Sequence, residues 1–163
     1  MKIPHGHKKT AVMVVLKNNN KFLLLKRKKA PNKDKFTPVG GKLEPFENPI
    51  HTAIRETREE TGLVLETVKF CGTLVESSPT KYNWICFIYL AEIADVTPPD
   101  CNEGTLEWID FENLLKVPTP PTDWFIYKYL LKEKPFAFNA TFDENLQLIS
   151  LIEEIETRTV FEK

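Results

Sequence analysis

The sequence predicts an α/β or α+β fold, in which helices cover both faces of a β-sheet. Three observations indicate this class. Short runs rich in β-branched, aromatic and apolar residues recur along the chain, two segments have apolar residues at helical spacing, and no internal repeat or low-complexity linker is present. The length of 163 residues fits one domain with its own hydrophobic core, so we expect a single domain over residues 1–163.

The first part of the chain predicts two paired strands and a loop. Residues 10–16 (TAVMVVL) and 22–25 (FLLL) are β-branched and apolar, and the asparagines between them indicate a turn. The basic stretch from residue 26 and the polar residues after it predict a loop up to residue 35. Residues 36–39 are expected to be a short extended segment before two glycines.

A helix is predicted to begin at Asn48 and Pro49 and to end near Gly62. An asparagine side chain can accept hydrogen bonds from the first-turn amides, and proline fits the first helical position. At about 100° per residue, one stripe of this helix is expected to face the core. The stripe consists of Ile50, Ala53, Ile54, Thr57 and Thr61.

The remaining chain predicts three strands and a second helix. Residues 64–75 and 84–93 are rich in strand-forming residues, and residues 106–111 are expected to form a short strand. Residues 123–132 have apolar positions suited to a helix, which KEKPF ends. The tail, residues 136–163, allows either type of element.

The composition limits the partners and the location. A formal net charge of -1 argues against long nucleic acid as the main ligand, because duplex affinity depends on neutralising phosphates, whereas a small anionic substrate fits. No apolar run approaches the roughly 18 residues that span a bilayer, and the first residues lack the apolar region of a secretory signal. Three widely spaced cysteines predict free thiols. We therefore expect a cytoplasmic protein without a membrane partner, either a monomer or a homodimer.

Three carboxylates crowd one face of the predicted helix. Glu56, Glu59 and Glu60 stand at i, i+3 and i+4, nearly opposite the apolar stripe. Like charges at this spacing repel, and the helix dipole disfavours anions in its C-terminal half. A cation would offset this cost, and we expect Mg²⁺, with Mn²⁺ as an alternative. A solvated face with Arg and Glu pairs is the other interpretation of such a segment.

Residues 41–63, GKLEPFENPIHTAIRETREETGL, resemble the Nudix box, G-x5-E-x7-R-E-U-x-E-E-x-G-U, in which U is apolar. Eight of the nine fixed positions match, namely Gly41, Glu47, Arg55, Glu56, Glu59, Glu60, Gly62 and Leu63. Only Thr57 departs from the pattern, and its methyl group can still pack against the core. The resemblance implies a Nudix fold, an α/β/α sandwich with a mixed β-sheet, and a Nudix hydrolase.

The resemblance also implies roles for the residues of the box. In the family the helix glutamates bind divalent metal, which here means Glu56, Glu59 and Glu60, and the carbonyl of Gly40 often completes the metal site. Glu47, with Gly41, is expected to support the loop, and Arg55 to orient a box glutamate such as Glu59.

A further glutamate outside the box often joins the metals or acts as the base in this family. Glu103, before a glycine and five residues before Trp108, resembles the loop glutamate of MutT-type members, whereas Glu107 is in a predicted strand. We therefore favour Glu103, and an ordinary solvated loop acid is the alternative. The proton of the attacking water goes either to Glu103 or to a box glutamate such as Glu59.

The substrate is expected to be a nucleotide. The run GGKLEPFE resembles MutT-type hydrolases, and PTPPTDWFIYKYLLKEKPF resembles the carboxy-terminal part of bacterial 8-oxo-dGTP diphosphatases. The implied reaction converts a nucleoside triphosphate, for example one with an oxidised purine, to monophosphate and pyrophosphate. ADP-ribose and dinucleoside polyphosphates are alternative substrates. A non-catalytic nucleotide sensor is less favoured, because all the metal-facing acids are intact.

Five residues outside the acidic face are candidates for substrate binding. Arg27 and Lys42 can approach the phosphates, Asp123 can hydrogen-bond a purine edge, and Trp124 or Phe36 can stack on the base. The alternatives are a solubilising basic edge for Arg27, a helix N-cap for Asp123 and core packing for the two aromatic rings.

Overall fold

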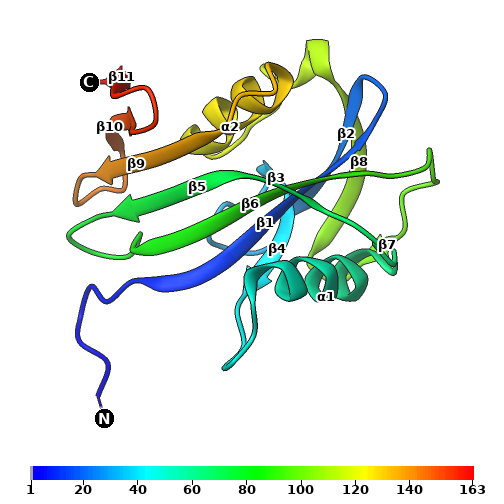
Figure 1. Cartoon of the computed structure of the whole chain (residues 1–163), viewed down its shortest axis with the longest axis horizontal. Coiled ribbons are helices and arrows are strands. Elements are labelled where there is room, and N and C mark those ends of the chain that lie inside the picture. Colours follow the sequence, from blue (N-terminus) through cyan, green and yellow to red (C-terminus); the bar gives the residue numbers. More distant parts are fainter. Residues whose placement is uncertain (1) are drawn as a thin grey trace.

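The computed structural model describes residues 2–163, in which eleven strands form one mixed sheet between two helices (Figure 1). The strands are β1 (Lys9–Asn18), β2 (Lys21–Arg27), β3 (Phe36–Thr37), β4 (Val39–Lys42), β5 (Lys69–Ser77), β6 (Trp84–Glu92), β7 (Asp100–Cys101), β8 (Gly104–Asp110), β9 (Phe136–Phe142), β10 (Leu148–Glu153) and β11 (Arg158–Glu162). The helices are α1 (Pro49–Thr61) and α2 (Pro121–Leu131), with a short 3-10 helix η1 (Phe111–Asn113).

The order of the strands places the amino-terminal strand at the centre of the sheet. The main path runs β11-β10-β9-β5-β6-β1-β2-β8-β7, while β3 pairs with β2 and β4 pairs with β1. Two pairs, β1 with β6 and β5 with β9, are parallel, and the other pairs are antiparallel. In Figure 1, α1 lies below the sheet and α2 above it, which confirms the prediction of helices on both faces.

Side chains that alternate along β1 supply two separate cores. Val12, Val14 and Leu16 are buried on the face that α1 covers, together with Ala53 of that helix. Val15, one position out of step, is buried on the face that α2 covers. Because both faces of the central strands are buried, their sequence is a nearly continuous apolar run.

Several observed element boundaries differ from the predicted ones. The strand expected at residues 64–75 is β5, which begins at Lys69 and ends at Ser77, because the chain first crosses from the end of α1 to the sheet. The basic residues Lys26 and Arg27 belong to β2, so the loop is shorter than predicted. The tail, for which the sequence allowed either element, forms β9, β10 and β11 on the β5 side of the sheet.

Helix α1 begins and ends where the sequence predicts, although the predicted capping by the Asn48 side chain and the predicted burial of Ile50 were wrong. Asn48 occupies the N-cap without a side-chain hydrogen bond, and its carbonyl instead accepts amide hydrogens of the first turn. Ile50 is 42% exposed, while Thr52 is buried in its place. Gly62 ends the helix in the left-handed conformation, at φ 75°, as a glycine can without strain.

The box threonine satisfies its own hydroxyl group within the buried stripe of α1. Thr57 is fully buried, and its Oγ1 donates to the carbonyl oxygen of Ala53 at 2.8 Å. The same arrangement recurs one turn later, where Thr61 Oγ1 donates to the Thr57 carbonyl oxygen at 2.6 Å. The departure from the apolar pattern therefore leaves no buried polar group without a partner at this position.

Other expectations can be checked over the described residues. Cys71, Cys86 and Cys101 are free, as predicted. Within residues 2–163, neither helix is long and apolar enough to cross a bilayer.

Candidate functional site

Two glycines bring β4 close to both β1 and α1. A Cβ atom on Gly40 would collide with the carbonyl oxygen of Val12, and one on Gly41 would collide with the carboxylate of Glu56. Gly40 pairs with Met13 of β1, and its φ of 157° disfavours other residues. The glycine pair thus lets the Glu56 carboxylate lie directly against the backbone of β4.

Glu60, the last acid of α1, contacts the glycine turn and has a raised pKa. Its Oε2 accepts the amide hydrogen of Gly40 at 3.2 Å, which ties the helix to the glycine turn. The pKa of Glu60 is raised to about 7, mainly by desolvation and with a contribution from the charges of Glu56 and Glu103, while the Gly40 amide and Arg27 act in the opposite direction. A positive charge at this place would therefore stabilise an ionised Glu60.

Arg55 organises the other acidic groups of the box. Its Nη1 donates to Glu56 Oε1 at 2.8 Å and reaches Glu59 Oε2 at 3.3 Å. Its Nε and Nη2 donate to the two oxygens of Glu47, each at 2.9 Å, and Nη2 also donates to the carbonyl oxygen of Lys42 at 3.1 Å. The sequence predicted that Arg55 orients a box glutamate such as Glu59. Arg55 does reach Glu59, and its shorter contacts are those with Glu47 and Glu56.

Glu47 holds the loop that leads into α1. Its Oε2 accepts hydrogen bonds from the amide of Glu44 at 3.0 Å and from Thr52 Oγ1 at 2.7 Å. The hydrogen bonds from Arg55, and then the one from the Glu44 amide, lower the pKa of Glu47 to about 2. This carboxylate is thus a fixed anion whose hydrogen-bonding capacity is used within the protein.

The donor set of α1 fits a hard divalent cation. Over residues 2–163, no three acidic, histidine or cysteine side chains already converge in the arrangement of a metal cage. Mg²⁺ does not require one, because it is usually bound by one or two carboxylates, waters and substrate phosphates. Glu56, Glu59 and Glu60 offer carboxylate oxygens of this kind, and glycine at position 41 leaves room for that of Glu56.

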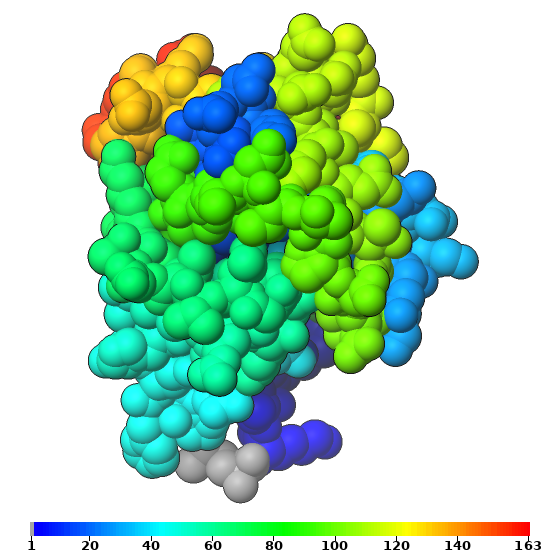
Figure 2. Space-filling model, turned by 90° about the vertical axis from the view of Figure 1, so that its right-hand side faces the viewer, coloured from blue at the N-terminus to red at the C-terminus, as the bar shows by residue number. Residues whose placement is uncertain are grey.

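The loop glutamate lies on the same side as these acids. Glu103 is exposed in the turn between β7 and β8, and its charge helps to raise the pKa of Glu60. Its carbonyl oxygen accepts the amide hydrogen of Lys28, and Arg27 pairs with Gly104 across β2 and β8. Figure 2 shows this light-blue segment around residue 30 beside the green-yellow one around residue 105. Glu107 lies in β8, as predicted.

The candidates for base binding are placed on the α2 side of the sheet. Phe36 is only 6% exposed and belongs to the core on this side, in agreement with core packing as its alternative role. Asp123 lies inside α2 and is 3% exposed, while the N-cap is Pro120, so the N-cap alternative for Asp123 was wrong. Trp124 is partly buried, with Lys128 Nζ 3.4 Å from the centroid of its ring.

Three buried polar atoms have no hydrogen-bond partner among the described residues, and two of them belong to α2. They are Thr37 Oγ1, Asp123 Oδ2 and the Tyr127 hydroxyl. Burial, and then the charge of Glu76, raise the pKa of Asp123, while Lys35 lowers it. Buried polar groups normally have a hydrogen-bond partner, so the Asp123 carboxylate marks a place where a polar ligand could supply one.

Sequence reasoning missed Thr37 in β3, and it missed Tyr127, Glu76 and Trp84 on the α2 side. Glu76 of β5 pairs with Trp84 of β6, which places both side chains on one face. Burial raises the pKa of Glu76 to about 7, and Lys8 lowers it. Their positions follow from the register of the strands, and no local motif in the sequence marks them.

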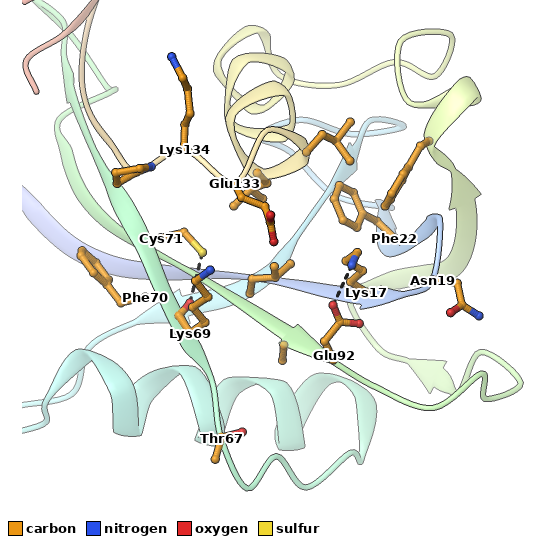
Figure 3. A pocket seen from close by; sticks show the side chains of 16 residues that line it. Lys17, Asn19, Phe22, Thr67, Lys69, Phe70, Cys71, Glu92, Glu133 and Lys134 are labelled. Atoms are coloured by element: carbon orange, nitrogen blue, oxygen red, sulfur yellow. Dashed lines mark hydrogen bonds and ion pairs between the residues drawn. The ribbon is translucent and has the colours of Figure 1, made fainter. Parts of the chain in front are cut away.

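Two cavities lie near the molecular surface, and one of them adjoins the box. A hollow of about 680 Å³ runs along α1 and is lined by Glu47, His51, Ile54, Arg55, Arg58 and Glu59. The other, of about 590 Å³, lies where the carboxy-terminal ends of β1 and β6 and the amino-terminal end of β5 meet the carboxy-terminal end of α2 (Figure 3). Its charged side chains include the ion pair of Lys17 and Glu92, at 2.8 Å. No box residue lines it, and neither of these two hollows is lined by Glu56, Glu60 or Glu103.

Comparisons with known proteins bear on the family and the fold of the chain. Residues 7–133 match the sequence model of the NUDIX domain family. An uncharacterised Nudix hydrolase of Bacillus subtilis is 28% identical over 72% of this chain and 76% of its own length. An ADP-ribose pyrophosphatase of Methanocaldococcus jannaschii is 34% identical over 68% of this chain and 67% of its own. A crystal structure of a MutT protein from Bacillus halodurans shares the fold, with a TM-score of 0.79 and 22% identity over 90% of this chain and 98% of that one.

Proposed function

Because the chain belongs to the NUDIX family of hydrolases, we propose that it hydrolyses a phosphoanhydride bond of a nucleoside diphosphate-linked substrate in the presence of Mg²⁺. The observation that carries the proposal is the acidic face of α1, where Glu56 and Glu60 lie beside the glycine turn of β4 and Glu59 contacts Arg55. The Nudix fold predicted from the box is the fold observed.

In the proposed site the metal is held by Glu56, Glu59 and Glu60, with the carbonyl of Gly40 as a further ligand. When bound, the ion supplies a water of lowered pKa and neutralises charge on the phosphate oxygens. Mn²⁺ is the alternative ion. Arg55 keeps Glu56 directed toward the turn, since it donates to that carboxylate at 2.8 Å.

The chain's own residues do the remaining work. Glu103 or a box glutamate such as Glu59 accepts the proton of the attacking water. Arg27 lies close enough to lower the pKa of Glu60, which supports a role for its guanidinium in binding substrate phosphates. Glu47 keeps the loop in position by its hydrogen bonds to Glu44 and Thr52.

The favoured substrate is a purine nucleoside triphosphate, for example 8-oxo-dGTP, which is cut to monophosphate and pyrophosphate. The GGKLEPFE run and the segment around α2 support this choice, as does the unpartnered carboxylate oxygen of Asp123, which could bond to a purine edge. ADP-ribose is the second candidate, because the methanogen relative is named for it. A dinucleoside polyphosphate is the third, as in the name of a mouse tetraphosphatase that matches 37% of this chain.

A screen of substrates tests both parts of the proposal. The purified protein is incubated with Mg²⁺ and 8-oxo-dGTP, dGTP, ADP-ribose or diadenosine tetraphosphate, and the products are separated by ion-exchange chromatography. A triphosphate gives a nucleoside monophosphate and pyrophosphate, ADP-ribose gives AMP and ribose 5-phosphate, and diadenosine tetraphosphate gives AMP and ATP. We expect the highest kcat/KM for the triphosphates, with pyrophosphate as the product. A preference for ADP-ribose would overturn the choice of substrate alone, whereas no turnover of any of them would overturn the activity.

A further inference from the structure

Trp84, the first residue of β6, has two lysine ammonium groups beside its indole ring. Lys9 Nζ lies 5.6 Å from the ring centroid, and Lys42 Nζ lies 5.8 Å from it. Lys9 pairs with Trp84 across β1 and β6, and Lys42 pairs with Ala11 across β4 and β1. The three long side chains therefore share one face of three neighbouring strands, with a small alanine between them.

Both ammonium groups are available to a ligand. Among the ion pairs and side-chain hydrogen bonds of residues 2–163, none involves the side chain of Lys9 or Lys42. The contact of each with the indole is a cation–π attraction near the outer limit of its range. A phosphate can compete for such groups without breaking an ion pair.

Lys42 joins this cluster to the acidic site. It directly follows Gly41, and its carbonyl oxygen accepts a hydrogen bond from Arg55 Nη2 at 3.1 Å. Lys42 thus contacts Arg55 of the box through its backbone and approaches Trp84 through its side chain. An indole with free cations beside it, next to a site for phosphate chemistry, matches the parts of a nucleotide, which are a flat base and an anionic chain.

We propose that Trp84 is the surface on which the base of the substrate stacks, while Lys9 and Lys42 bind the phosphates between the base and the box. This inference rests on the function proposed above and adds the residue that holds the base. The two aromatic residues favoured from the sequence are less suited. Phe36 is buried in the core, and the ring of Trp124 is covered by Lys128 and packs edge-on against Phe125.

Intrinsic fluorescence tests the stacking without catalysis, because the chain has only three tryptophans. The probe is α,β-methylene-dGTP, and tripolyphosphate, which has no base, is the control ligand. Trp84→Phe is compared with two control variants, Trp108→Phe and Trp124→Phe. Trp108 lies in β8, where its ring nitrogen donates to the Val96 carbonyl oxygen. We expect the nucleotide to quench the wild type and both control variants, and the quenching to be largely lost in Trp84→Phe. Equal quenching by tripolyphosphate, or quenching retained in Trp84→Phe, would overturn the inference.

Kinetics separate this inference from the proposed function. Trp84→Ala is expected to raise KM for the preferred nucleotide about tenfold or more, as loss of a base–aromatic stack does, with kcat within about threefold of the wild type. Trp84→Phe should keep KM within about threefold, since phenylalanine also offers an aromatic face. Turnover with an unchanged KM in Trp84→Ala would overturn the inference and leave the activity standing. If Trp84→Ala fails to fold, as judged by circular dichroism, the fluorescence of Trp84→Phe decides.

Discussion

Arg55 and Glu47 are joined by two side-by-side hydrogen bonds, from Nε to Oε1 and from Nη2 to Oε2, each 2.9 Å long. Both side chains are mostly shielded, at 24% and 14% exposure. A guanidinium and a carboxylate that meet in this way fix each other's orientation as well as their distance. The pair fastens the loop after β4 to the middle of α1, and the same guanidinium reaches Glu56 and Glu59.

Arg55→Lys tests the importance of this geometry. Lysine keeps the charge but cannot make two parallel hydrogen bonds or contact three acids at once. We expect the free energy of unfolding, measured with urea, to fall by about 1–2 kcal/mol. The kcat should fall by at least about tenfold, because Glu56 and Glu59 lose a fixed donor. Arg58→Lys, on the same helix and without these contacts, is the control, and equal effects of the two changes would contradict the account.

The two glycines of β4 are predicted to differ in their response to substitution. In Gly41→Ala the nearest atoms to the new methyl group are those of the Glu56 carboxylate, a side chain that can rotate away. Stability should therefore change by less than about 1 kcal/mol, while the Mg²⁺ concentration for half-maximal activity rises. In Gly40→Ala the methyl group meets the Val12 backbone at a strained φ, so we expect a loss of about 1–3 kcal/mol. Urea unfolding and Mg²⁺ titration of both variants measure the contrast, and the reverse order would refute it.

Much of the fold follows from local patterns in the sequence. The strand β1 and the box helix from Pro49 to Gly62 were predicted because each depends on neighbouring residues only. The start of β5 and the three tail strands were not, since strand pairing with distant segments decides them. Ile50 was misplaced because an ideal helical stripe ignores the hydrogen bond that draws Thr52 toward Glu47.

The candidate site likewise has one part that could be predicted from local sequence and one part that could not. The box residues are close in sequence, so their grouping around Arg55 could be anticipated. Trp84 and Glu76 meet only through the register of β5 and β6, and Asp123 comes from α2 on the same side. No spacing along the chain shows such a relationship, which is why Trp124 was favoured for stacking instead of Trp84.

The pH dependence of stability is predicted to depend in part on Glu76. Burial raises its pKa from the ordinary 4.5 to about 7, against the opposing charge of Lys8. In turn, after burial, the charge of Glu76 raises the pKa values of Asp123, Tyr82 and Cys86. A carboxyl with a raised pKa contributes stability below its unfolded pKa and loses that contribution as pH rises through the folded pKa. The free energy of unfolding should therefore fall between about pH 4.5 and pH 7.

Glu76→Gln removes this ionisation. The variant is expected to match the wild type near pH 4.5 and to exceed its stability at pH 8 by up to about 3 kcal/mol. Urea unfolding at a series of pH values makes the comparison, with the exposed Glu112→Gln as the matched control. A difference between Glu76→Gln and wild type that does not change with pH would contradict the assignment.

The central claim is that the acidic face of α1 holds the divalent ion on which hydrolysis depends, and Glu60→Gln tests it most directly. The change keeps the size of the side chain and a carbonyl oxygen for the Gly40 amide, so circular dichroism should show an intact fold. The measurement is the Mg²⁺-dependent kcat for the preferred nucleotide, beside Glu66→Gln as an exposed control. We predict a fall of about a hundredfold or more in Glu60→Gln alone, and an unchanged kcat in that variant would contradict the account.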